Sequence, residues 1–125
     1  MPAPRSELLQ GTLELLVLKA LSLEPMHGWG LAQRLDQLSN AVVRVQQGSL
    51  YPALQRMKRR GWIKSEWRTS ENNRRARYYF LTPAGKRQLA TEATLWQRAS
   101  KAVDEILSVG LVTGAPRARL ARGEK

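Results

Sequence analysis

The segment of this chain with the clearest chemistry is residues 48–61, GSLYPALQRMKRRG. Leu50, Leu54 and Met57 recur at helical spacing, so one side of a helix here can bury against a core. The other sides carry hydroxyl, amide and cationic groups, which form hydrogen bonds with the base edges and phosphates of DNA. Alone, the segment is more typical of an ordinary surface helix with a solvated basic side. The case for a DNA-reading helix therefore depends on the rest of the chain.

Two residues set the expected limits of this helix. Pro52 would break a helix interior but is tolerated in a first turn, so we expect the helix to begin near Ser49. Gly61 is placed to end it, because glycine readily adopts the left-handed conformation that closes many helices.

Positive charge is concentrated in about one third of the chain. The formal net charge is +11. Residues 44–87 hold twelve Lys and Arg against two acids, Glu66 and Glu71, whereas the other 81 residues hold nine basic and eight acidic side chains. A localised excess of this kind indicates a surface that meets a polyanion such as a nucleic acid.

The residue inventory excludes several kinds of chemistry. The chain has no cysteine and one histidine, His27, so disulfides and zinc sites built from Cys and His are ruled out. No carboxylate or nucleophile accompanies His27 in its motif, and we expect it to be a turn or capping residue. With no phosphate-cradling glycine loop and no nucleophile elbow, we expect no cofactor, no metal and no enzymatic activity.

The length and hydropathy pattern favour one soluble domain with an appendage. The chain has 125 residues, of which 42% are apolar, enough for a single core. Its longest apolar stretch, residues 8–23, is interrupted by polar side chains, and the first residues lack a secretory pattern. We expect a cytoplasmic protein without a membrane partner.

The elements around the basic segment follow the order of a helix-turn-helix. Residues 8–23 predict a first helix that is apolar on two sides, ended by Pro25. A second helix is expected from His27 to about Leu38, and residues 39–47 connect it to the helix that begins near Ser49. A helix, a short link and a recognition-type helix are the parts of that motif.

A β-hairpin is expected directly after the basic helix. Ile63, Ser65 and Trp67 alternate with charged residues, which is typical of a strand with one covered face. Residues 77–81 predict a second strand, and the polar residues 69–76 fit a loop between the two. Arg74 and Arg75 lie in this loop and Arg77 at the start of the second strand. They either form a solvated tip or make this hairpin a wing that grips DNA, and its position favours the wing.

The C-terminal part predicts a long helix and a homodimer. Thr82 followed by Pro83 is a strong helix start. The helix could reach Val109, about 40 Å at the usual rise per residue. Its apolar residues fall near heptad spacing, and an uncovered apolar seam implies that the helix packs on a second copy. The seam is Leu89, Ala93, Trp96, Ala99, Val103, Ile106 and Leu107.

Four stretches resemble the PadR family of bacterial transcriptional regulators. They are GTLELLVL at residues 11–18, PMHGWGL at 25–31, GSLYPAL at 48–54 with GWI at 61–63, and RYYFLTPAG at 77–85. Their order and spacing together are far more specific than any one of them. The resemblance implies an N-terminal winged helix-turn-helix, a C-terminal dimerisation helix, and binding to a pseudo-palindromic operator, usually as a repressor.

The short C-terminal part resembles the compact subgroup of this family. Drug-binding relatives of that kind stack planar ligands on aromatic side chains at the dimer interface, and Trp96 stands where it could do so. The equally weighted alternative is that Trp96 only fills the interface. Gly30 departs from the family pattern, since relatives often carry an acidic residue there.

These inferences give one mainly α fold with a small β-hairpin, and a role for each group of residues. The expected parts are a winged helix-turn-helix at residues 1–81, a dimerisation helix at 82–110 and a basic flexible tail at 111–125. The candidate DNA-binding residues are Arg44, Ser49, Tyr51, Gln55, Lys58, Arg59, Lys64, Arg74 and Arg75. The candidate dimer-interface residues are Leu8, Leu15, Leu89, Trp96, Ala99, Val103 and Ile106. The alternative function is that of a basic protein that binds nucleic acid without sequence preference.

Overall fold

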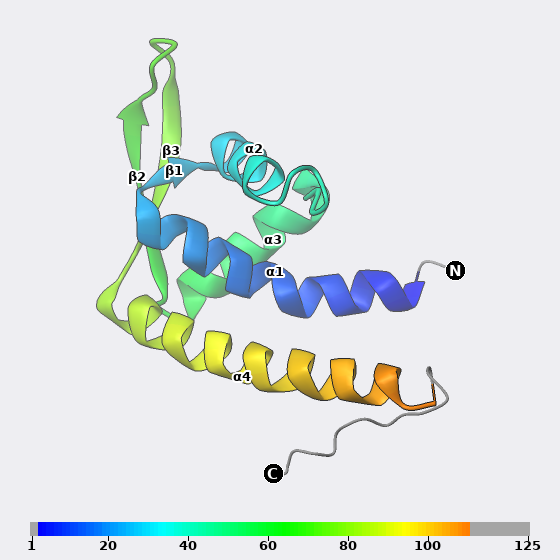
Figure 1. Ribbon diagram of the computed structural model, residues 1–125. Helices are drawn as coiled ribbons and strands as arrows, with labels where there is room; N and C mark the ends of the chain where they lie inside the picture. The colour runs from blue at the N-terminus through cyan, green and yellow to red at the C-terminus, as the bar shows by residue number, and fades with distance from the viewer. Residues whose placement is uncertain (1–2, 111–125) are drawn as a thin grey trace. The chain divides into compact units, whose positions relative to one another are not determined.

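The computed structural model describes residues 3–110, with side chains described from residue 12 onward. The elements in chain order are α1 (Ala3–Leu23), β1 (Met26–His27), α2 (Gly28–Leu38), α3 (Gln47–Arg59), β2 (Ile63–Thr69), β3 (Arg75–Leu81) and α4 (Pro83–Ser108) (Figure 1). The chain divides into two compact units, Met1–Thr91 and Glu92–Lys125, so α4 begins in the first and ends in the second. The expected tail, residues 111–125, lies outside the described residues.

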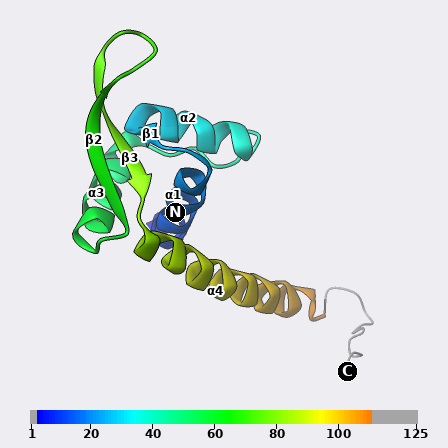
Figure 2. The same cartoon turned by 90° about the vertical axis from the view of Figure 1, so that its left-hand side faces the viewer.

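The first unit is a winged helix-turn-helix, which confirms the predicted fold class. Three helices pack beside an antiparallel sheet whose strand order is β1-β3-β2 (Figures 1 and 2). The two-residue strand β1 pairs Met26 with Tyr79 and His27 with Tyr78. The sequence analysis missed β1, because a strand of two residues is too short to show an alternating pattern.

The core is assembled from every element of the first unit up to β3. Its largest fully buried side chains are Val17, Leu18, Leu31, Leu50, Leu54, Met57 and Ile63. Leu50, Leu54 and Met57 were predicted to face a core, and this is confirmed. Burial of a side chain of this size contributes about 1.5–3 kcal/mol to folding.

Two helices begin earlier than expected. α1 starts at Ala3 rather than residue 8, and α3 starts at Gln47 rather than Ser49. The earlier start places Pro52 inside α3, in its second turn, where its ring nitrogen cannot donate to the carbonyl four residues back. Pro52 is exposed, so water can reach the backbone there.

His27 caps α2, as its place in the sequence predicted. Its backbone is extended, and its Nδ1 accepts a hydrogen bond of 2.9 Å from the Gly30 N–H. A Cβ on residue 30 would lie 3.0 Å from the imidazole ring. A larger residue at this position would therefore require the imidazole to shift by a few tenths of an ångström.

The β2–β3 hairpin extends beyond the helices and forms the wing (Figure 1). Its register runs from Ile63 opposite Leu81 to Thr69 opposite Arg75. The prediction that Trp67 lies on a covered face is wrong. Ile63 is buried at the base of the hairpin, but Trp67 is 55% exposed because the strand has left the core by that point.

Thr82 joins the hairpin to α4 as the predicted helix cap. Its hydroxyl lies 2.6 Å from the Gly61 carbonyl and 3.0 Å from the Trp62 carbonyl, and it accepts a hydrogen bond of 3.0 Å from the Gly85 N–H. A Cβ on Gly85 would overlap the Trp62 carbonyl oxygen, so only glycine permits this approach. Gly61 has φ +79°, as expected of a residue that ends a helix.

Most of the predicted apolar seam lies in the second unit. Leu89 belongs to the first unit and packs against its core, whereas Trp96, Val103 and Ile106 are 45%, 51% and 69% exposed in the single chain. Ala99 is exposed as well. In the first unit Leu15 is half-buried, and the side chain of Leu8 lies outside the described ones.

Replacement of Thr82 by alanine removes the cap and the hydroxyl that donates to the Gly61 carbonyl, while the Trp62 carbonyl keeps its bond from the Thr82 N–H. We expect Thr82→Ala to lower the free energy of unfolding by about 1–3 kcal/mol. Urea denaturation at one fixed protein concentration measures this, since an oligomer's stability depends on concentration. Thr82→Ser retains the hydroxyl and is the matched control. Equal losses in the two variants would show that the cap does not hold this junction.

Candidate nucleic-acid interface

The side of α3 that faces away from the core presents Gln55 and Arg59. Successive residues of a helix are turned by about 100°, which places these two opposite the buried Leu50, Leu54 and Met57. Both are exposed. Gly48 and Pro52 share this side and add no large polar group, so the helix backbone can approach a ligand closely. The exposed side of α3 therefore combines one amide and one cationic side chain with two residues that carry no large polar group.

The remaining α3 candidates lie at the flanks of that side. Tyr51 and Lys58 lie on one flank and Ser49 on the other, because residues 49 and 51 differ by about 200° of rotation. Tyr51 is 40% exposed, Lys58 is half-buried and Ser49 is exposed. The structure thus brings Tyr51, Gln55, Lys58 and Arg59 onto one continuous surface and sets Ser49 apart from Tyr51.

Tyr51 also joins α3 to α2. A Cβ on Gly28 would lie 2.5 Å from the Tyr51 hydroxyl oxygen and 2.7 Å from two ring carbons, so the ring covers the backbone of that glycine. From the sequence, Tyr51 was predicted only to bind DNA, and this packing was not predicted. The glycine before an aromatic residue in the motif HGWG was the available signal.

A buried tyrosine lies on the inner side of this region. Tyr79 on β3 is only 4% exposed. Burial raises the pKa of the Tyr79 hydroxyl, the nearby Tyr51 raises it further, and Arg77 lowers it.

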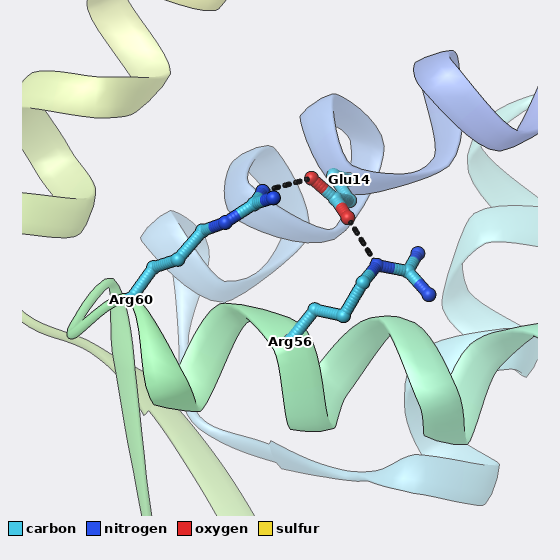
Figure 3. Close-up of polar contacts among 3 residues, drawn as sticks. All are labelled: Glu14, Arg56 and Arg60. Carbon is cyan, nitrogen blue, oxygen red and sulfur yellow. Dashed lines mark hydrogen bonds and ion pairs between the residues drawn. The ribbon is translucent and has the colours of Figure 1, made fainter.

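Two cations, Arg56 of α3 and Arg60 directly after it, pair with a carboxylate of α1. The Glu14 carboxylate lies 3.0 Å from Nε of Arg56 and 3.4 Å from a terminal guanidinium nitrogen of Arg60 (Figure 3). The Glu14 side chain is 18% exposed, so solvent screens these pairs less than open surface pairs. Arg56 and Arg60 therefore fasten α3 to α1, whereas Arg59 between them points away and stays available.

The wing carries its own group of cations. Its tip is a turn in which Ser70 N–H donates to the Arg74 carbonyl at 2.7 Å and Asn73 adopts φ +60°. Arg74 in the turn and Arg75 at the start of β3 are both exposed. Of the remaining predicted phosphate contacts, Lys64 is exposed on β2 and Arg44 is exposed in the link before α3.

Trp67 and Arg77 of the wing were not among the predicted DNA-binding residues. The guanidinium carbons of Arg75 and Arg77 lie 5.3 and 5.1 Å from the centroid of the Trp67 ring, within the range of cation–π attraction. The signal in the sequence was an aromatic residue in β2 whose partners across the hairpin are arginines.

Neither a metal-binding group nor a membrane-spanning helix is found among the described residues. Within residues 3–110 no group of three or more His, Asp or Glu side chains could hold a metal ion. No helix in that range is long and apolar enough to cross a membrane.

The sequence matches a known family of regulators. The model of the family described as "Transcriptional regulator PadR-like family" matches residues 17–91, which is more than half of the chain. A protein from a Streptomyces fradiae transposon, described as an uncharacterized 37.1 kDa protein, is 37% identical over 92 residues, 74% of this chain. The chain covers only 25% of that relative.

Solved structures of regulators share the fold. A PadR-like transcriptional regulator from Bacillus cereus superposes with a TM-score of 0.70 at 30% identity, over 81% of this chain and 96% of that one. A PadR family transcriptional regulator from Eggerthella lenta gives 0.70 at 29% identity, over 86% and 92%. Both neighbours are described as transcriptional regulators.

Removal of the Glu14 charge should loosen the attachment of α3 to α1. We expect Glu14→Gln to lower the free energy of unfolding by about 1 kcal/mol at low salt, because Arg60 is more than half exposed and contributes little. In 1 M NaCl the loss should shrink, since the screening length falls to about 3 Å. Urea midpoints at both salt concentrations measure it. Glu24→Gln, at an exposed residue, is the control, and a loss as large as that of Glu14→Gln would remove the special role of Glu14.

Proposed function

Because this chain belongs to the PadR-like family of transcriptional regulators, we propose that it represses transcription as a homodimer bound to a pseudo-palindromic DNA operator. The family and the winged helix-turn-helix establish a DNA-binding transcription regulator. The finer proposal is supported mainly by the exposed face of α3, where Gln55 and Arg59 lie opposite a fully buried apolar side.

The proposed binding mode places α3 in the major groove. Gln55 is the residue best placed to read a base, since a side-chain amide can form two hydrogen bonds with N6 and N7 of adenine on its major-groove edge. Ser49 and Tyr51 lie at the flanks of α3 and contact either base edges or backbone. Lys58 and Arg59 supply charge for phosphates, and phosphate contacts fix the position of the helix without reading sequence.

The proposed wing contacts add affinity. Arg74 and Arg75 bind phosphates beside the groove that α3 occupies, and Arg44 and Lys64 are further phosphate contacts in the proposal. The cations that already have carboxylate partners, Arg56 and Arg60, are excluded from this set.

The proposed dimer explains the exposed apolar side chains of α4. Trp96, Val103 and Ile106 are each at least 45% exposed in one chain, which a soluble monomer rarely tolerates over a contiguous helix. Packing of this helix on a second copy would bury them, with Ala99 allowing close approach and Leu8, Leu15 and Leu89 completing the predicted interface. Two α3 helices would then enter successive major grooves, about 34–36 Å apart.

A small-molecule effector is a further part of the proposal. Trp96 offers an aromatic surface on which a planar molecule could stack between subunits. Such a molecule would relieve repression only by favouring one arrangement of the two α3 helices over another. The alternative for Trp96 is an interface-filling side chain with no ligand.

Sequencing of genomic fragments bound by the purified protein tests the function directly. We expect the fragments to share an inverted repeat, and a duplex with that repeat to bind at least about a thousandfold more tightly than an unrelated duplex at physiological salt. Similar affinity for all duplexes would instead support the alternative of a non-specific nucleic-acid-binding protein.

A Gln55→Ala variant should lose discrimination at one base pair of each half-site, about 1–3 kcal/mol.

The wing prediction concerns salt dependence. Replacement of both Arg74 and Arg75 by alanine should weaken binding to every duplex, and the slope of log affinity against log salt should fall by about 0.9 for each lost phosphate contact. Fluorescence anisotropy over a range of salt concentrations gives the slope. The control replaces Arg98 and Lys101, two exposed cations of α4, by alanine and removes the same charge. Equal slopes in both double variants would place the wing outside the interface.

A further inference from the structure

We propose that Trp67 is a positioning residue that holds the guanidinium groups of Arg75 and Arg77 on one face of the wing, ready to bind DNA phosphates. The proposal rests on the proposed function and adds two residues, Trp67 and Arg77, to its interface. It also assigns the DNA contact to one particular face of the hairpin.

The strand register places the three side chains on the same face. Trp67 stands directly opposite Arg77, and Thr69 stands opposite Arg75. Alternate residues of a strand point to the same side, so Trp67 and Thr69 share a face with both arginines. This is the face that buries Ile63 and Tyr79 lower in the hairpin, continued beyond the core.

The exposed indole has no role in the core. Trp67 is 55% exposed, whereas Ser65, two residues earlier on the same face, is half-buried. Its ring contacts are with the two cations, whose guanidinium carbons lie 5.3 and 5.1 Å from its centroid. A large aromatic side chain kept in water beside two arginines is better explained by what it does to the arginines than by packing.

Stacking on an aromatic ring leaves an arginine competent to bind a phosphate. The contact uses the flat face of the guanidinium, and its N–H donors lie in the plane at the edge. A carboxylate partner would occupy those donors and cancel the charge. Among the described residues no ion pair joins Arg75 or Arg77 to an acid, so both keep their charge and their donors.

The opposite face of the wing is electrically different. There Arg68 donates from Nε to the Glu66 carboxylate at 2.6 Å, and its guanidinium lies 5.4 Å from the Tyr78 ring centroid. This arginine also stacks on an aromatic ring, but its charge is already paired. One face therefore presents two cations on an indole, and the other presents a neutralised pair, with Lys64 nearer the base of the hairpin.

The indole would restrict the arginine side chains before they bind DNA. A long arginine side chain loses rotamer freedom when it is fixed on a phosphate, and this loss opposes binding. An arginine already held against a ring loses less. We therefore expect Trp67→Leu, which keeps an apolar residue without a π face, to weaken DNA binding roughly fivefold to tenfold. Trp67→Phe retains a ring and should restore most of the affinity.

A double-mutant cycle separates positioning from other roles. Anisotropy at low salt measures binding of a labelled random-sequence duplex by the full chain, by Trp67→Leu, by Arg75→Ala with Arg77→Ala, and by the triple variant. If the indole acts through the arginines, Trp67→Leu weakens binding in the parent protein but has almost no effect once both arginines are gone. Glu66→Ala with Arg68→Ala, on the opposite face, should change affinity less than twofold.

Each other outcome has a distinct meaning. No weakening by Trp67→Leu overturns the proposal, and so does equal weakening in both backgrounds, which would indicate direct contact of the indole with DNA or general damage to the fold. A Trp67→Phe variant as weak as Trp67→Leu, with unchanged urea midpoints, also contradicts it. Failure of the parent protein to bind any duplex at low salt would instead overturn the proposed function.

Discussion

Burial of one side of α3 is the constraint on which the rest of the structure depends. Leu50, Leu54 and Met57 are completely inaccessible to solvent, and rotation of α3 about its axis would expose them. The opposite side is therefore fixed as well, and with it the position of Gln55 and Arg59. A helix that reads DNA must present the same few side chains each time it docks. Here that constancy comes from apolar packing, which costs the exposed side none of its polar groups.

Electrostatic contacts divide the cations of the basic region into two classes. Arg56 and Arg60 meet Glu14, and Arg68 meets Glu66, so these three serve the protein itself. Arg59 points away from the first pair, and Arg75 and Arg77 of the wing lie over the Trp67 ring. The net charge of the region overstates the charge offered to a ligand, since each carboxylate near a cation cancels part of the attraction for phosphate. Among the residues that the structure describes, the cations without a carboxylate partner include Arg59 on the outer side of α3 and Arg75 and Arg77 on one face of the wing.

The sequence was sufficient for the parts of this arrangement that are local. Helical spacing predicted the burial of Leu50 and Met57, and the caps at His27 and Thr82 followed from residue type and position. It was insufficient where the outcome depends on contacts distant in the chain. Glu14 meets α3 across 42 residues, and neither its partner nor the orientation of Arg56 leaves a local signal. Trp67 was expected to be covered because it shares a face of the strand with Ile63. Alternation shows which residues share a face, but it does not show where along the strand the core ends.

Strand β3 holds the two parts of the interface in a fixed relation. Tyr79 pairs with Met26 in β1, directly before the cap of α2. Tyr51 of α3 covers the backbone of Gly28 in the first turn of α2. The wing is the continuation of the same strand, so a shift of the wing relative to these helices would have to disturb the pairing of β3 with β1. In the proposed binding mode, coupling of this kind would lower the entropy lost on binding, because one docking event would place α3 and the wing together. The wing's arginines would then affect specificity indirectly, since phosphates bound by the wing would restrict which base pairs Gln55 can reach.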